Sequence, residues 1–306
     1  MLNSIAQEQN KVRYLDRIAA SSYLYSKAKF ILLIQVLLSV AITVIFSIVV
    51  AVFPRFEIWA AFYGISVSII DAAILDDFQT SLKRQAAKVQ ELFDCELLHL
   101  DWNKIKIGNR PDAESINRLA KKFKQKSTNL ATIENWYPSV VQNVPLPIAR
   151  LICQRANCWW DSNLRQRYIV WVVSTFCLVT ILVFAIGLSN TITIQRFFIV
   201  ILAPLSPTIL WSIREYRKQR EAIETLERLK DYVENFWVDI INKKLNPDQI
   251  ERESRELQDG IYDYRCNNPL IFNWIYNLLR NSQEEAMNKG AEELVEEALR
   301  SLNSGH

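Results

Sequence analysis

Residues 30–53 read FILLIQVLLSVAITVIFSIVVAVF and include no charged side chain. A helix rises about 1.5 Å per residue, so this stretch is long enough to cross the ~30 Å hydrocarbon core of a bilayer. Pro54 and Arg55 follow directly and favour an end to the apolar helix. The stretch predicts a first transmembrane helix, whose polar members are Gln35, Ser39, Thr43 and Ser47.

Three further stretches have the same apolar character. Residues 58–75 follow after a short link, which makes the first two spans an antiparallel hairpin. Residues 168–188 carry no charge, and residues 197–213 contain Pro204 and Pro207, which a transmembrane helix tolerates with a kink. The sequence therefore predicts an all-α membrane protein with four transmembrane helices.

Basic residues mark the side on which the polar parts lie. Lys and Arg are frequent before the first span, between spans two and three, and after span four, whereas the other two links hold only Arg55 and Arg196. Because basic loops stay in the cytoplasm, both termini and the middle loop are predicted to be cytoplasmic. The expected divisions are a cytoplasmic N-terminal helix (1–29), spans one and two (30–75), a cytoplasmic helical region (76–167), spans three and four (168–213) and a cytoplasmic C-terminal helical region (214–306).

Apolar residues at steps of three and four predict helices in these polar parts as well. Spans two and four are expected to continue beyond the membrane, over about 76–100 and to about 245. Other helices are predicted over 4–28, over 113–126, after Pro147, from Pro247 and over 284–299. The first of these offers a packing face of Ile5, Val12, Leu15, Ile18 and Ala19.

The composition argues against several functions. The net charge of +3 is too small to indicate a DNA or RNA partner, and no Gly-rich phosphate loop or hydrolase motif occurs. Only His99 and His306 are histidines, and Cys153 and Cys158 are poorly spaced for zinc. We therefore expect no enzyme activity, no metal and no cofactor, and free thiols at the five cysteines.

Two stretches combine arginine with aromatic residues. In the first, a helix would place Arg150, Gln154, Asn157, Asp161 and Arg165 on one polar face, beside Arg155, Trp159 and Trp160. In the second, Tyr262 and Arg265 have a similar character. Guanidinium groups suit phosphates and aromatic rings stack on bases, so these ten residues are candidates for binding an anionic nucleotide. The alternatives are interface anchoring, ion pairs between helices and aromatic packing.

Asp71 is an acidic residue inside the second span. Intramembrane acids are costly and tend to face a bundle interior or a water-filled path, so Asp71 is a candidate pore or gating residue. Alternatively, it reaches the interface near Asp76 and Asp77. Lys27 and Lys29, at the first membrane entry, are expected to be interface anchors.

Longer runs resemble a known family. They are YSKAK at 25–29, AAKVQELFDC at 86–95, WYP at 136–138, CQRANCWWD at 153–161 and QDGIYDYR at 258–265. These runs resemble the SMODS-associating 4TM effector family, over most of the chain to about residue 290. The resemblance implies a bacterial inner-membrane effector of CBASS-type antiphage defence, which senses a cyclic oligonucleotide made by a nucleotidyltransferase and disrupts the membrane.

Three functions remain open at this point. The first is a ligand-gated effector, expected to be a homo-oligomer because four spans are few for a pore. The second is a membrane-bound phosphate-ester hydrolase, in which Asp94, Asp161 and Asp259 would hold a metal. The third is a signalling or scaffold protein without a pore, for which Asp71 would be incidental.

Overall fold

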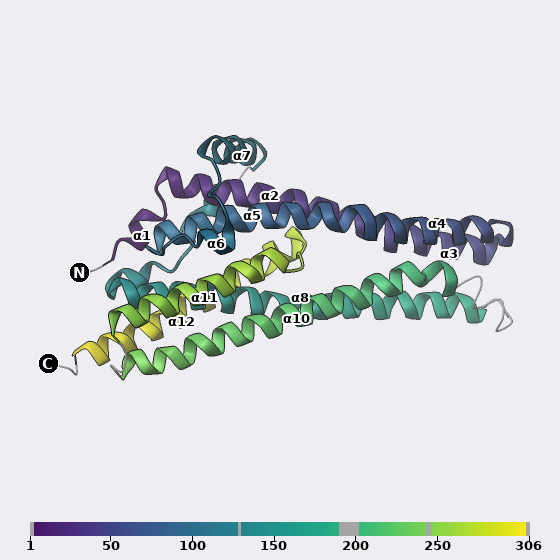
Figure 1. The fold of residues 1–306 in the computed structure, drawn as a ribbon. Coiled ribbons are helices and arrows are strands. Elements are labelled where there is room, and N and C mark those ends of the chain that lie inside the picture. Colours follow the sequence, from purple (N-terminus) through teal and green to yellow (C-terminus); the bar gives the residue numbers. More distant parts are fainter. Residues whose placement is uncertain (1–2, 128–129, 190–201, 243–245, 304–306) are drawn as a thin grey trace.

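The computed structural model describes residues 3–127, 130–189, 202–242 and 246–303, and these are mostly helical (Figure 1). Long helices run side by side along an elongated bundle, and both chain termini lie at the same end. The long helices form two hairpins, which share the long axis, and shorter helices cover one end.

The first hairpin consists of two long, nearly continuous helices. After the short α1 (Ile5–Glu8), α2 (Val12–Val36) continues through a π-helical turn (Leu37–Ile42) into α3 (Thr43–Val52). The chain turns at Pro54–Phe56, as the sequence predicts, and returns through α4 (Glu57–Ile70), a second π-helical turn (Asp71–Leu75) and α5 (Asp76–Leu97). The predicted continuation of span two is confirmed.

The second hairpin is formed by α8 (Leu146–Ser189) and α10 (Ala203–Ile241), which pack along each other. The sequence predicts a separate short helix after Pro147, but α8 runs without a break into the third span, because no Pro or Gly interrupts 148–186. The continuation of span four is confirmed over α10. The first residues of the predicted fourth span, 197–201, lie outside the described residues.

The remaining helices cover the polar end. They are α6 (Lys104–Ile107), α7 (Ala113–Lys126), α11 (Pro247–Asn267) and α12 (Asn273–Asn303), with short 3-10 turns at Leu130–Ile133 and Ser139–Asn143. The predicted bounds of α7 agree with the structure, and α11 begins at Pro247 as predicted, capped by Asn246. Proline fits there because the first helical position needs no N–H donor.

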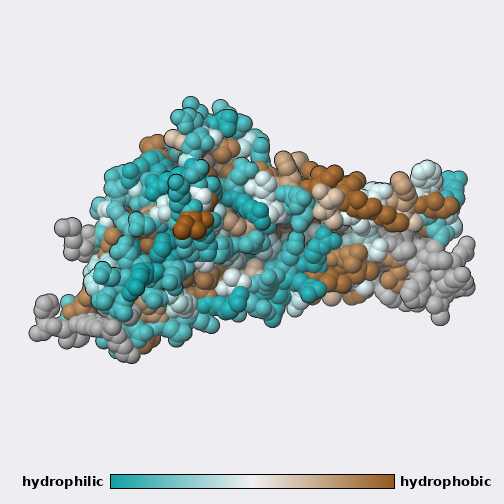
Figure 2. Space-filling view, viewed as in Figure 1, coloured by the Kyte–Doolittle hydropathy of each residue, from teal (hydrophilic) through white to brown (hydrophobic). Residues whose placement is uncertain are grey.

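The two ends of the bundle have different surfaces. Figure 2 shows hydrophobic residues gathered over the α3–α4 end and mainly hydrophilic residues over the other. Three described helical stretches, Val12–Val50, Pro54–Leu97 and Leu146–Leu182, are long and apolar enough to cross a membrane. Trp59 and Phe62 in α4 are about two-thirds exposed, as expected for side chains that face lipid.

The polar end has its own apolar core, to which N-terminal, middle and C-terminal residues all contribute, from Ile5 to Ala298. Of the predicted N-terminal packing face, Ile5, Ile18 and Ala19 are buried and Leu15 packs against the core. Val12 is the exception, with 69% of its surface exposed. It is the first residue of α2, after the break that separates α1 from α2, so the register of the face changes there.

Candidate functional site

The candidate ligand residues on α8 have protein partners. Arg150 donates from Nε to the Leu98 carbonyl at 2.9 Å and from Nη2 to the His99 carbonyl at 3.0 Å. The Gln154 side-chain amide donates to the Ser254 carbonyl at 2.8 Å. Both side chains are buried, so in this structure they join α8 to neighbouring segments and present no open surface.

Arg165 is the centre of a second buried network. Its guanidinium donates to the Gln219 side chain at 2.7 Å, to the Pro269 carbonyl at 2.8 Å, to Asp161 at 3.2 Å and to the Tyr264 hydroxyl. Burial raises the pKa of Tyr264 well above its usual value, so the phenol stays protonated and can donate to Asp161. Arg165 thereby holds α8, α10 and α11 together.

Arg265 has a comparable place in the core. It pairs with Asp94, which also accepts from the Tyr137 hydroxyl at 2.6 Å and from Gln258 at 3.1 Å. Both partners of the ion pair are almost completely buried, at 7% and 0% exposure of the side chain. Such a pair requires both members, because removal of one leaves a buried charge uncompensated.

The other candidates are more peripheral. Asn157 donates to the Tyr137 hydroxyl at 2.9 Å, and Arg155 pairs with Glu234 at 3.0 Å near the surface. Trp159 and Trp160 are half-buried, and Tyr262 packs with Ala87, Ile107 and Cys266. The ten candidates therefore belong to several networks and do not meet in one open cavity.

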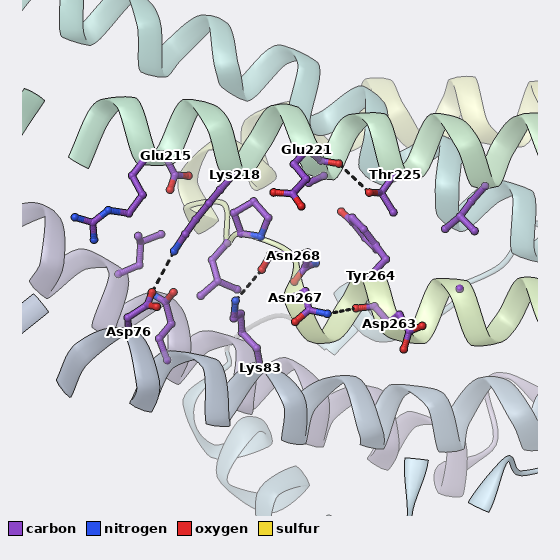
Figure 3. Close-up of a pocket in the computed structure, with 18 of the residues that line it drawn as sticks. Asp76, Lys83, Glu215, Lys218, Glu221, Thr225, Asp263, Tyr264, Asn267 and Asn268 are labelled. Atoms are coloured by element: carbon purple, nitrogen blue, oxygen red, sulfur yellow. Dashed lines mark hydrogen bonds and ion pairs between the residues drawn. The ribbon is translucent and has the colours of Figure 1, made fainter. Parts of the chain in front are cut away.

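A large cavity lies elsewhere, between α5, α10 and the end of α11. Its volume is about 870 Å³, large enough for a drug-sized or larger ligand. We call it the inter-helix cavity; Figure 3 shows its polar walls. Asp76, Gln79 and Lys83 line it from α5, Asp263, Tyr264, Asn267 and Asn268 from α11 and its end, and Arg214, Lys218, Glu221, Thr225, Arg228 and Tyr232 from α10. All ten candidate ligand residues lie outside this lining.

Lys83 is the most unusual group in the cavity. Its side chain is 6% exposed, and its ammonium donates to the Asn268 carbonyl at 3.1 Å (Figure 3). Among the described residues no carboxylate lies within ion-pair distance of it. Burial, with Lys218 nearby, lowers the pKa of Lys83 to about 8. A buried cation that faces a cavity without a counter-ion is a suitable partner for an anionic ligand.

Two of the other cations of the cavity are already paired with carboxylates. Lys218 contacts Asp76 at 3.1 Å, and Arg214 contacts Asp71 at 2.9 Å. Glu215, which is buried and accepts from Gln219 at 2.8 Å, has its pKa raised by burial. The carboxylates of Asp76 and Asp71 thus contact the two cations with which the phosphates of a ligand would have to pair.

The deep end of the cavity reaches the predicted membrane. Asp71 is 4% exposed and accepts from Gln35 at 2.8 Å as well as from Arg214. Gln79 donates to Gln35 at 2.8 Å. These four residues, which we call the inner junction, connect α2, the second π-helical turn, α5 and α10 at the point where apolar spans meet the polar end.

Three helices are irregular close to the inner junction. The π-helical turns Leu37–Ile42 and Asp71–Leu75 flank it, and Pro207 lies inside α10. About two turns deeper, the Thr43 and Thr208 hydroxyl oxygens are 2.8 Å apart, and Thr208 donates to the Ser39 carbonyl at 2.8 Å. Because π-helical turns and prolines weaken the regular hydrogen-bond ladder, helices can bend there at low cost.

The comparisons with known proteins agree with this architecture. Residues 3–294 match the model of the SMODS-associating 4TM effector domain. The chain belongs to that family. It is also 25% identical to a probable CBASS effector molecule of Bacillus cereus (strain VD146), over 92% of this chain and 95% of that protein. No solved structure matches.

The family name of this SMODS-associating 4TM effector implies four transmembrane spans, and three long apolar helices are described in the structure. Together they indicate a multi-pass membrane protein.

The three carboxylates considered for a hydrolase do not form a cluster: Asp94 pairs with Arg265, Asp161 with Arg165 and Asp259 with Arg255. Within the described part of the chain, no group of three or more His, Cys, Asp or Glu side chains is arranged to hold a metal ion.

Of the cavity residues of this effector, the sequence singled out Asp71 but not those of α10, although a signal was present. The residues of α10 that line the cavity recur at steps of four and three: Arg214, Lys218, Glu221, Thr225, Arg228 and Tyr232. This is a polar face of one helix. Taken alone, such a face is normally solvated, and only the position of α5 and α11 opposite makes it a cavity wall.

Proposed function

We propose that this chain is a membrane effector of antiphage defence that binds a cyclic oligonucleotide in the inter-helix cavity and then permeabilises the bacterial inner membrane. Family membership supports the effector role. The observation that carries the mechanism is the lining of the cavity, which includes both Asp71 and Arg214 of the inner junction. A ligand in this cavity therefore contacts the groups that hold the spans together.

The binding step would be an exchange of ion-pair partners. Ligand phosphates would contact Lys83 directly and would compete with Asp76 for Lys218 and with Asp71 for Arg214. Tyr232, which is 37% exposed at the cavity, and the amide of Asn267 offer stacking and hydrogen bonding to bases. Such phosphate contacts are charge-assisted, and are stronger than neutral hydrogen bonds.

Loss of the Asp71–Arg214 ion pair would loosen the inner junction. Without Arg214, the buried Asp71 carboxylate is left with Gln35, and an incompletely paired intramembrane charge attracts water. Bending at the π-helical turns and at Pro207 would then separate α3 from α10. The polar side chains Ser39, Thr43 and Ser47, all buried in this structure, would line the resulting path.

The opened path would require several copies of the chain. Four spans enclose little space, and large apolar side chains on α4 and α8 are exposed, which leaves surface for contacts between copies as well as for lipid. We therefore expect a homo-oligomer, with the cavity and both termini in the cytoplasm, as the basic residues indicate. The ligand would come from a nucleotidyltransferase of the same defence system. No catalytic role is proposed for the chain.

Leakage from liposomes tests this proposal. Purified protein in proteoliposomes that contain a fluorescent dye is exposed to a panel of synthetic cyclic di- and trinucleotides. The expected result is dye release with at least one of them and none with linear counterparts. Correctly inserted protein that binds a cyclic oligonucleotide without any release would support the signalling or scaffold alternative instead.

A further inference from the structure

A second cavity opens on the side of the bundle and shares Trp211 with the inter-helix cavity. Its volume is about 570 Å³. It lies between α2 and α8, and Thr208, Trp211 and Ser212 of α10 form its floor. Phe272 and the first residues of α12 close it at the polar end. We call it the lateral groove.

The walls of the lateral groove are mainly apolar, and Lys29, the one charged residue in its described lining, lies at the polar end. Phe30, Leu33, Val36 and Val40 line it from α2, and Trp171, Val172, Phe176 and Val179 from α8. Ser26, Lys29 and Asn273 lie at the polar end. The Lys29 ammonium donates to the Asn273 side-chain oxygen at 2.8 Å, and among the described residues it has no carboxylate within ion-pair distance.

The length of the groove corresponds to one leaflet of a bilayer. From Lys29 to Val40 the helix rises about 16 Å, and the distance from Tyr168 to Val179 on α8 is the same. Half of a ~30 Å hydrocarbon core is about 15 Å. An acyl chain that starts beside Lys29 would therefore end near the middle of the membrane.

Two tryptophans stand at the mouth of the groove at the level of the interface. The rings of Trp171 and Trp274 meet edge to face with centroids 5.7 Å apart, and about half of each side chain is exposed. Tryptophan in this position is typical of the boundary between headgroups and acyl chains. The groove thus has an apolar part, an aromatic boundary and a cation in the order in which a phospholipid has an acyl chain, a glycerol region and a phosphate.

We propose that the lateral groove is a binding site for one phospholipid of the leaflet next to the polar end, with an acyl chain between α2 and α8 and the phosphate on Lys29 and Asn273. This site is independent of the ligand in the inter-helix cavity, because it needs only a membrane-embedded chain. The bound chain would contact Thr208, whose hydroxyl also joins α10 to Ser39. The lipid would therefore support the closed arrangement of the spans.

Native mass spectrometry of the detergent-purified full chain tests the site, with phosphatidylglycerol as the added probe. The wild-type protein should retain one tightly bound phospholipid per chain. Lys29→Gln removes the charge at the rim, and Val36→Phe fills the groove; each should lower phosphatidylglycerol occupancy about tenfold, as expected for loss of a charge-assisted contact or of the space itself. Lys27→Gln is the matched control, since Lys27 is exposed two residues away and does not line the groove.

The presence and the absence of a lipid site predict different occupancies. Occupancy that falls with Lys29→Gln and Val36→Phe, but not with Lys27→Gln, supports the site. Absence of a retained lipid in the wild type, or equal occupancy in all four proteins, would overturn it. Because Val36→Phe can also disturb packing, the melting temperature of each variant is measured in parallel, and Lys29→Gln, at the rim, provides the second independent variant.

Discussion

Asp71 of the second span and Arg214, which directly follows the fourth span, are joined by an ion pair of 2.9 Å, in which the Asp71 side chain is buried and the Arg214 side chain is 42% exposed. The buried carboxylate makes the pair costly to break from the membrane side, whereas the exposed guanidinium makes it accessible to a competing anion.

The ion pair predicts ligand-independent activity when it is removed. Asp71→Asn keeps the size of the side chain but gives up the charge that holds Arg214, so liposomes should leak dye without added nucleotide, and the variant should be toxic in cells. Asp77→Asn, on the same helix but exposed, should behave as wild type. A double-mutant cycle of Asp71→Asn and Arg214→Gln should give a coupling free energy of about 1 kcal/mol between the two residues. If the effects of the two substitutions are additive, the ion pair is incidental.

Lys83 predicts how ligand binding depends on pH. Phosphate binding favours the charged ammonium, and the pKa of Lys83 in the empty cavity is about 8. Affinity for an active cyclic oligonucleotide should therefore be constant below about pH 7 and should fall as the pH rises through 8, by at most tenfold per pH unit. The affinity is measured by calorimetry across pH 6–9.5, with the pH values chosen to bracket that pKa.

Substitution at the same position gives the matched comparison. Lys83→Gln should weaken binding at pH 7 and should remove the decline in affinity around pH 8. Arg84→Gln changes the neighbouring residue, which is exposed, and should leave both properties unaltered. Equal affinity of the Lys83→Gln and wild-type proteins would exclude Lys83 as a ligand contact.

The buried pair of Arg265 and Asp94 predicts a loss of stability, and not a selective loss of ligand binding. Arg265→Ala should lower the free energy of unfolding by about 3–5 kcal/mol, because Asp94 would remain buried without its partner. Arg155→Ala removes a surface pair with Glu234 and should cost about 1 kcal/mol or less. Titration with SDS, followed by tryptophan fluorescence, distinguishes them; similar stabilities would contradict the structural role of Arg265.

Two glycines give opposite predictions. A Cβ atom on Gly260 would lie 2.7 Å from Leu229 Cδ2, so Gly260→Ala should force the Leu229 side chain of α10 to move and should cost about 1 kcal/mol. On Gly290, in α12, a Cβ atom would meet nothing within 4 Å, and Gly290→Ala should stabilise the helix by about 0.5–1 kcal/mol. The same SDS titration shows whether each substitution raises or lowers the stability. A neutral Gly260→Ala would mean that the helices are less closely packed than described.

Much of the fold could be predicted because local patterns determine it. The charge-free run 30–53, the Pro54 turn, the Pro247 start and the apolar periodicity of 113–126 each depend on residues close in sequence. The continuity of α8 was missed because the polar character of 150–167 suggested a separate helix. The start of the fourth span lies outside the described residues, so only its continuation along α10 can be compared.

The candidate site could be predicted only in part. The sequence singled out Asp71 as an intramembrane acid, but its partners, Gln35 and Arg214, come from other helices and no local pattern connects them. The Arg150–Arg165 face was correctly placed on one helix. The role of this face depends on the segments that pack against it: the end of α5, α10 and α11 provide partners such as Leu98, Gln219 and Tyr264. The binding role of these residues stays a prediction.

If ligand binding separates α3 from α10, as proposed, a reversible cross-link between them should prevent opening. The Thr43 and Thr208 hydroxyl oxygens are 2.8 Å apart, so Thr43→Cys with Thr208→Cys places two thiols within reach of each other. Cys177, which is exposed, is replaced by serine in the variant and in the parent protein. With an active cyclic oligonucleotide, the oxidised variant should release no dye from liposomes, and a reductant should restore release to the level of the parent. Equal release from the oxidised and reduced variant would contradict the account.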